Sequence, residues 1–254
     1  MPIENRDEIC YKRNYLTSVI ARIDFPSPLK QVSKGLPRPM VDLIKEMFPV
    51  PEPKPFVAQE MQFSNMQVKQ RRVNEGIEWN FHGENKEKTL TIGPSALFVN
   101  WRQYNSYQDL KNEFLRTALE FLGHYKGTQI SRIGMRAINE LKMDEQKPLD
   151  WSEYVNPELL HLLDFGEDTK FLSRAFHNLE SNFGDFNLRF QFGMHNPDYP
   201  AKIVKKVFIL DFDAYYQGLT DRDQLTECCD RYHEKLQEYF EASITDKLRE
   251  KMNA

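Results

Sequence analysis

The sequence predicts an α+β protein in which antiparallel strands carry two long amphipathic helices on one face. Three observations support this. Many segments alternate apolar and polar residues and are separated by Gly and Pro turns, as in antiparallel sheets. Two longer segments, 107–125 and 221–251, repeat apolar residues at helical spacing. Strands followed by a long helix occur in both halves of the chain, which predicts a tandem pseudo-repeat of residues 1–147 and 148–254, packed as one compact unit.

In the first half, the β-branched residues at 18–25 are typical of a strand, whereas the four prolines at 49–55 predict a stiff extended connection and no element. The expected elements are, in order, a strand at 18–25, a helix at 37–48, strands at 69–81, 87–92 and 95–102, a helix at 107–125 and a strand at 128–142.

In the second half, the segment from Asp185 to His195 contains the clearest half-buried strand, with strict alternation of apolar and polar residues. The expected elements are, in order, a short helix at 156–163, strands at 169–180, 184–195 and 202–214, and a helix at 221–251.

Charge is divided unevenly along the chain. Its 254 residues contain 34 Lys and Arg and 38 Asp and Glu, a net charge of −4, which argues against a generic nucleic-acid coat. Residues 1–147 carry 22 basic and 18 acidic side chains (+4), and residues 148–254 carry 12 and 20 (−8). We therefore expect an anionic partner on the first half, and we treat the second half as a surface for protein docking or self-association into a homo-oligomer.

The usual catalytic and targeting signatures are missing from the sequence. It has no Gly-rich phosphate loop, no His-Glu-x-x-His and no Cys-x-x-Cys, and its three cysteines form no disulfide framework. The N-terminal residues do not have the layout of a signal peptide, and no stretch approaches the roughly 18 apolar residues of a membrane span. These patterns predict a cytoplasmic protein with no cofactor and no membrane contact.

Basic side chains form the main candidate site, because alternation places five arginines on the polar faces of several strands. Guanidinium groups bind carboxylate or phosphate through paired hydrogen bonds, so arginines that converge on one sheet face would bind an anionic ligand. Gly134 would let that ligand or a second backbone approach closely. The alternative is a solvated face of cross-strand Arg-carboxylate pairs. The candidate ligand-binding residues are Arg22, Arg72, Arg132, Arg136 and Arg189.

Two carboxylates form a weaker candidate site. Asp211 and Asp213 lie on one face of a predicted strand, where they could hold Mg²⁺ or divide acid and base roles. No third ligand is visible near them in the sequence, so the sequence predicts no metal site of the usual kind.

The segment Ile130 to Asn139, with the pattern Arg-Ile-Gly-Met-Arg-x-Ile-Asn, resembles the central motif of a sporadically distributed prokaryotic family of unknown function. The resemblance extends over most of the chain, through the matching segments Val19–Phe25, Trp101–Tyr107, Leu210–Asp213 and His233–Asp246. Ala137 stands where the family usually has an aromatic residue. No activity or cofactor is established for the family, and its patchy distribution implies an accessory, mobile-element or defence gene. The resemblance directs attention to Asn139, Trp101 and Tyr104 as structural residues, Asn139 as a hydrogen-bonding group in the core.

These observations leave three hypotheses for the function. The first is a non-catalytic binding or regulatory module that uses the arginine face for an anionic small molecule, a nucleic acid or a partner protein. The second is a metal-dependent enzyme that acts on a phosphorylated or nucleotide substrate. The third is a protein-interaction scaffold. A distance of more than about 10 Å between Arg132, Arg136 and Arg189, or a carboxylate partner for each, would argue against a shared anion site.

Overall fold

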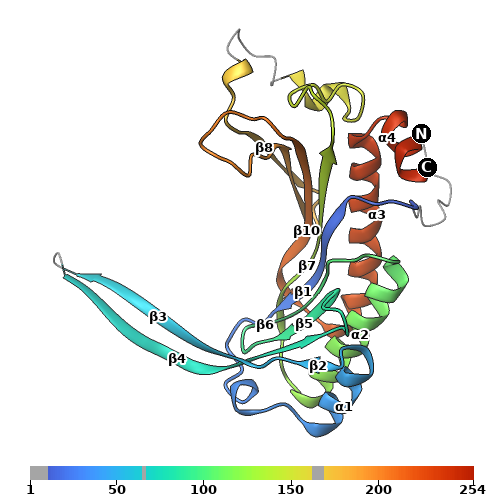
Figure 1. The fold of residues 1–254 in the computed structure, drawn as a ribbon. Helices are drawn as coiled ribbons and strands as arrows, with labels where there is room; N and C mark the ends of the chain where they lie inside the picture. The colour runs from blue at the N-terminus through green and yellow to red at the C-terminus, as the bar shows by residue number, and fades with distance from the viewer. Residues whose placement is uncertain (1–10, 65–66, 162–168) are drawn as a thin grey trace.

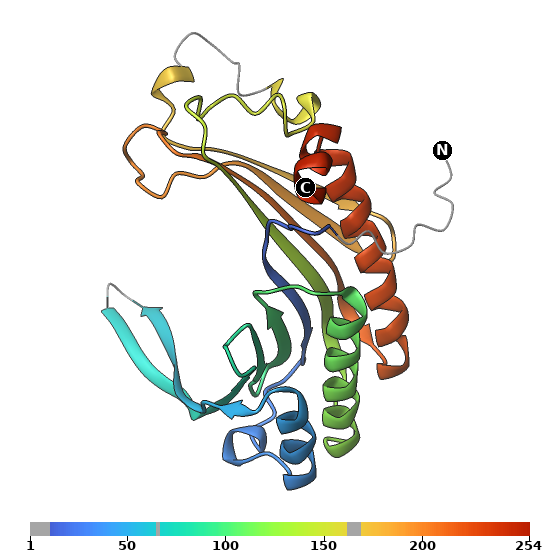
Figure 2. The same ribbon diagram turned by 45° about the vertical axis from the view of Figure 1, so that its right-hand side comes forward.

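The computed structural model describes residues 11–64, 67–161 and 169–254, and between 56 and 75 it describes the backbone alone. It confirms the predicted fold class, an α+β fold built on a large antiparallel sheet of ten strands. The sheet is curved, and the long helices cover its convex face (Figure 1, Figure 2). The opposite, concave face is open.

The strands are β1 (Leu16–Asp24), β2 (Val50–Pro51), β3 (Lys54–Ser64), β4 (Gln67–His82), β5 (Lys88–Ile92), β6 (Ala96–Trp101), β7 (Ile130–Met143), β8 (Ala175–Asn182), β9 (Asn187–Met194) and β10 (Lys206–Thr220). The helices are α1 (Arg38–Met47), α2 (Tyr107–His124), α3 (Leu225–Ser243) and α4 (Asp246–Asn253). The strands lie side by side in the order β2-β4-β5-β6-β1-β7-β10-β9-β8, and β3 pairs with β4 outside this path.

Strict alternation along the central strands separates the two faces of the sheet. Ala21 and Ile23 of β1, Met135 of β7 and Phe212 of β10 are buried on the side covered by the helices. Fully burying a side chain such as Phe212 contributes roughly 1.5–3 kcal/mol to folding. Residues between these positions point to the concave face, where no helix covers them in Figure 2.

Helix α2 begins where the sequence predicts it, because Ser106 caps its first turn. The Ser106 hydroxyl accepts a hydrogen bond from the backbone N–H of Asp109 at 3.1 Å. The predicted strands of the first half and the helix at 37–48 are also present, with boundaries shifted by at most two residues.

The proline-rich segment is not the simple connection that the sequence predicts. Val50 and Pro51 pair with His82 and Phe81 of β4, and β3 begins at Lys54. Pro51 is tolerated because β2 is an edge strand, where a missing N–H leaves no ladder bond broken. The sequence interpretation missed β3, which forms with β4 a hairpin that projects away from the sheet on its concave side (Figure 1).

Four elements of the second half also differ from the prediction. The strand expected at 202–214 is β10, which begins at Lys206 and extends to Thr220. In place of the helix at 156–163 the structure has a 3₁₀ turn at Pro157–Leu159, and residues 162–168 lie outside the described part of the chain. The strand expected from residue 169 begins at Ala175, after a second 3₁₀ turn at Thr169–Phe171. These turns are short and aperiodic, and a window of sequence distinguishes them poorly from helix or strand.

The terminal helix is broken into α3 and α4. Ile244 adopts an extended conformation and forms an isolated β-bridge with Val155. Thr245 then caps α4, since its hydroxyl accepts a hydrogen bond from the N–H of Leu248 at 3.4 Å. An apolar periodicity that continues across 244–245 conceals this local cap.

Strand β7 joins the two halves of the chain into one sheet. It pairs with β1 on one side and with β10 on the other, so that its residues lie at the centre of the curved sheet. Within the described residues, no helix combines the length and the apolar character needed to cross a membrane.

Candidate functional site

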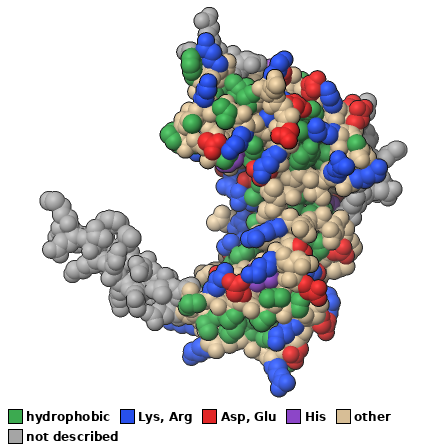
Figure 3. All heavy atoms as spheres, in the orientation of Figure 1, with side chains coloured by type: hydrophobic (Ala, Val, Ile, Leu, Met, Phe, Trp, Pro, Cys, Tyr) green, Lys and Arg blue, Asp and Glu red, His purple; other side chains and the backbone are tan. Residues whose placement is uncertain are grey.

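The concave face brings together arginines from three strands and aspartates from the strand β10 that lies between two of them. In the register of the sheet, Arg22 of β1 lies opposite Gly134 of β7, and Asp213 of β10 lies opposite both Arg136 of β7 and Arg189 of β9. Because residues paired across strands point to the same face, these side chains occupy adjacent positions. The space-filling view shows Lys and Arg along the inner margin of this hollowed side (Figure 3).

A bidentate ion pair on this face joins Arg136 to Asp211. Arg136 donates from Nε and Nη2 to the two carboxylate oxygens of Asp211, at 2.8 and 2.5 Å. The Asp211 side chain is only 7% exposed. Hydrogen bonding to this carboxylate raises the pKa of the Arg136 guanidinium above its ordinary value, although burial acts in the opposite direction. This paired geometry fixes Arg136 at the edge of the hollow.

Asp213 is shared by two arginines. It accepts hydrogen bonds from Nη2 of Arg132 at 3.2 Å and from Nη2 of Arg189 at 3.3 Å. Arg22 donates to Asp24 at 2.9 and 2.6 Å, and Nη1 of Arg132 lies 3.8 Å from the same Asp24 carboxylate. Four of the predicted arginines, Arg22, Arg132, Arg136 and Arg189, therefore lie together on this face. Each also has a carboxylate partner, which argues against a preformed site for a free anion and leaves only the remaining guanidinium donors for a partner.

Gly134 makes room for Arg132. A Cβ atom at this position would lie 2.8 Å from Nη1 of Arg132, whose guanidinium carbon is also 5.0 Å from the ring centre of Tyr215. The group that approaches the Gly134 backbone is thus the guanidinium of its own strand, where the sequence suggested a ligand or a second backbone. The Arg-x-Gly spacing is explained by this packing.

A hollow of about 300 Å³ lies over these residues. Its lining has three guanidinium groups, two carboxylates and two apolar side chains around Gly134. The residues are Ile20, Arg22, Asp24, Phe98, Arg132, Gly134, Arg136 and Asp213. The excess of one positive charge favours an anionic group, and Ile20 and Phe98 provide an apolar contact beside it.

Two other predicted sites have different outcomes. The backbone of Arg72 pairs with Gln59 in the β3–β4 hairpin, and its side chain lies outside the described residues. Asp211 and Asp213 do share one face, but both carboxylates bind arginines. Across the described part of the chain, no three His, Cys, Asp or Glu side chains gather closely enough to hold a metal ion.

The three residues assigned structural roles lie on the convex side. Trp101 is buried and donates from Nε1 to Glu113 at 3.2 Å, and Tyr104 packs edge-to-face against it at 6.5 Å. Asn139 is 4% exposed and donates to the carbonyl of Leu210 at 3.5 Å. Tyr104 and Asn139 also line a cavity beneath α3.

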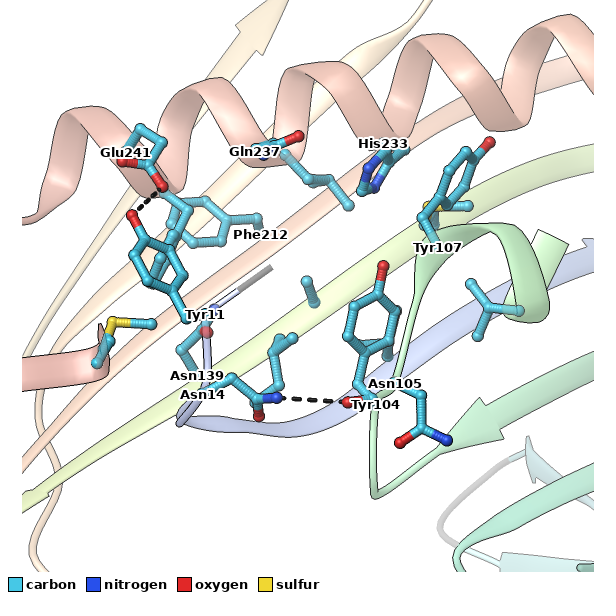
Figure 4. Close-up of a pocket in the computed structure, with 18 residues that line it drawn as sticks. Tyr11, Asn14, Tyr104, Asn105, Tyr107, Asn139, Phe212, His233, Gln237 and Glu241 are labelled. Carbon is cyan, nitrogen blue, oxygen red and sulfur yellow. Dashed lines mark hydrogen bonds between the residues drawn. The ribbon is translucent and has the colours of Figure 1, made fainter. Parts of the chain in front are cut away.

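Further residues of that cavity escaped sequence reasoning. His233, Gln237 and Glu241 follow each other at intervals of four along α3, so they form one row on the helix surface that faces the cavity (Figure 4). Tyr107 stacks on His233 with ring centres 3.8 Å apart. A polar row of period four on an otherwise amphipathic helix is the signal that could have predicted this cavity.

Comparison with known proteins adds no assignment to either face of the sheet. No protein-family model and no curated protein matches this chain, so its resemblance to the prokaryotic family stays a prediction.

Proposed function

We propose that the protein is a non-catalytic binding module whose concave face docks an acidic segment of a partner protein. The observation that carries this proposal is the convergence of Arg22, Arg132 and Arg136 around one hollow, beside which Arg189 binds the lining residue Asp213. The resemblance of residues 130–139 supports a role in an accessory system of prokaryotes, of the mobile or defence type.

The arginines retain donors for such a partner. A guanidinium has five N–H donors, and the closest contacts of Arg132 and Arg189 with Asp213 use Nη2 alone. The side chains of Arg22 and Arg189 are 42% and 40% exposed, so an incoming carboxylate reaches them without unfolding the sheet. The aspartates hold the guanidinium groups in place before the partner binds, which lowers the entropy lost on association.

The mixed charge of the hollow favours an acidic protein segment over a nucleic acid. Nucleic-acid affinity comes mainly from several cations without carboxylate partners, and here two carboxylates accompany three guanidinium groups in the lining. Alternating charges of this kind give specificity to protein interfaces. The metal-enzyme hypothesis is less favoured, because arginines occupy the carboxylates of Asp211 and Asp213.

The test is the binding of a fluorescein-labelled octaglutamate peptide, measured by anisotropy at several salt concentrations. The variant Arg22→Gln/Arg189→Gln removes the two most exposed guanidinium groups of the face. We expect it to weaken peptide binding at least tenfold. Binding by the wild type should weaken as salt rises, because the exposed charges are screened.

The matched control is Arg38→Gln/Arg116→Gln, which removes the same charge from exposed positions on α1 and α2. It should bind the peptide like the wild type. The proposal is wrong if the wild type does not bind the peptide, or if both double variants lose affinity equally. Tighter binding of a 12-nucleotide single-stranded DNA than of octaglutamate would favour the nucleic-acid hypothesis instead.

A further inference from the structure

A second site lies behind the sheet, in the cavity between its convex face and α3. The cavity has a volume of about 110 Å³ and is bounded by α3, the start of α2 and the segment that precedes β1 (Figure 4). An apolar cavity of about 150 Å³ binds benzene, so this smaller space limits a ligand to one small ring. We propose that it binds a neutral, single-ring heterocycle with adjacent N–H and C=O groups, of the uracil type.

Asn139 is the buried carboxamide of the cavity lining. It projects from β7 and is 4% exposed, yet within the described structure its carboxamide has one long hydrogen bond, of 3.5 Å, to the carbonyl of Leu210. Buried carboxamides normally use more of their hydrogen-bonding capacity. A planar amide-like edge would satisfy both the oxygen and the second N–H of Asn139 through a pair of parallel hydrogen bonds.

Aromatic side chains supply the faces for a planar ring. Phe212 and Phe240 line the cavity from β10 and α3, and Tyr104 rises from the opposite side with its hydroxyl towards α3 (Figure 4). Rings of this kind stack on planar heterocycles. Ala137 lies beside them in the lining, and its small side chain leaves space that a larger residue would fill.

The lining also determines the charge of the ligand. The residues described around the cavity include no Lys or Arg, so a phosphate or carboxylate would be buried there without a cation. Glu241 accepts a hydrogen bond from Tyr11 at 2.7 Å and one from Arg249 at 2.8 Å. Its charge is already balanced by Arg249, and a cationic ligand gains little from it. A neutral ligand therefore fits the cavity best.

The experiment is a titration of the full chain with uracil. Calorimetry measures the binding, and NMR spectra record the side-chain amide signals of Asn139. We expect saturable binding and a shift of those signals. The variant Asn139→Leu keeps the volume of the side chain and removes the amide, so it should bind uracil at least tenfold more weakly while it still binds toluene. Uridine 5′-monophosphate should bind more weakly than uracil to the wild type.

A second variant tests the location independently of Asn139. Ala137→Phe fills the cavity, so it should abolish binding of both uracil and toluene without lowering the melting temperature. Leu119→Phe, at an exposed position on α2, is the control and should leave the affinity for uracil and for toluene unchanged. The proposal is overturned if the wild type does not bind uracil, if Asn139→Leu binds it with unchanged affinity, or if the nucleotide binds more tightly than the base.

Discussion

The two faces of the sheet are built from the same strands and differ in how they use them. On the concave face, Arg136 and Arg132 hold carboxylates of β10 and remain a quarter to a third exposed, at 35% and 24%. On the convex face, Met135 of the same strand is 2% exposed beneath the helices. Because side chains alternate with period two along a strand, residues next to each other in the sequence point to the arginine face and to the core in turn.

This difference shows where the stability of the fold comes from. Exposed ion pairs contribute little because water screens them, whereas each buried aromatic side chain contributes several times as much. The exposed charges of the concave face can therefore change with little loss of stability. The convex face cannot change its large side chains in the same way. Three predictions test this comparison, taken from the largest expected effect to the smallest.

Truncation of Phe212 should be the most damaging change. Phe212 is fully buried on β10 and stacks on Phe190 with ring centres 4.6 Å apart. Phe212→Ala loses this burial and enlarges the cavity beneath α3, which should lower the free energy of unfolding by about 3–5 kcal/mol. Urea denaturation followed by circular dichroism measures the change.

Its control is the same substitution on the other face. Phe98 is half-buried on the concave side of β6, where Arg22 lies 5.4 Å from its ring centre. Phe98→Ala should cost no more than about 1.5 kcal/mol, since less area is buried. An equal loss of stability in both variants would break the comparison between the faces.

The sequence predicts most of this two-faced architecture, because alternation is a local property. Alternation with period two alone predicts that Arg132 and Arg136 lie on one face of their strand and that Ile133 and Met135 lie on the other. The carboxylate partner of each arginine does not, because it depends on the register between β7 and β10, which are about 75 residues apart in the chain. Sequence reasoning could therefore find the arginines, but it could not show that Asp211 and Asp213 neutralise them.

The cavity was harder to predict, because it also depends on contacts between segments that are far apart in the sequence. Asn139, Tyr104 and His233 come from three distant segments, and no pattern within one segment shows that the three side chains meet. The missed strand β3 illustrates a different limit. Its backbone pairs with β4 in a hairpin that projects from the sheet, and backbone pairing, which residues of almost any type can form, leaves no signal in a short window of sequence.

Arg136 should have an intermediate effect, because its partner is buried although it is itself partly exposed. Arg136→Met leaves the Asp211 carboxylate, which is 7% exposed, without its two hydrogen bonds. A loss of about 2 kcal/mol is expected. The double variant Arg136→Met/Asp211→Asn should recover part of it, because the uncompensated buried charge is removed.

Arg22→Met serves as the control on the same face, since Arg22 is 42% exposed and its partner Asp24 lies two residues along the same strand, β1. It should lower stability by less than about 1 kcal/mol. If both variants lower the free energy of unfolding equally, burial of the carboxylate partner does not determine the cost of removing an arginine, and the expected contrast between Asp24 and Asp211 is wrong.

The smallest effect concerns alkaline pH and the convex side. Burial, and to a smaller extent a hydrogen bond to Asp230, raises the pKa of Tyr107 above its ordinary value near 10. Above pH 10 an unfolded Tyr107 loses its proton while the folded residue keeps it. The unfolded state then binds fewer protons, so stability falls as pH rises, by up to about 1.4 kcal/mol per pH unit for this group.

Tyr107→Phe should therefore flatten the decline of the urea midpoint between pH 9.5 and 11 relative to the wild type. The change leaves Asp230 paired, because Lys111 also contacts it at 2.6 and 2.8 Å. Tyr199→Phe, at a residue that is 55% exposed, is the control and should leave the slope unchanged. If Tyr107→Phe also leaves the slope of the urea midpoint against pH unchanged, the Tyr107 hydroxyl is more accessible to water than its burial indicates. The contrast between the two faces of the sheet would then be smaller than the exposed fractions of their side chains suggest.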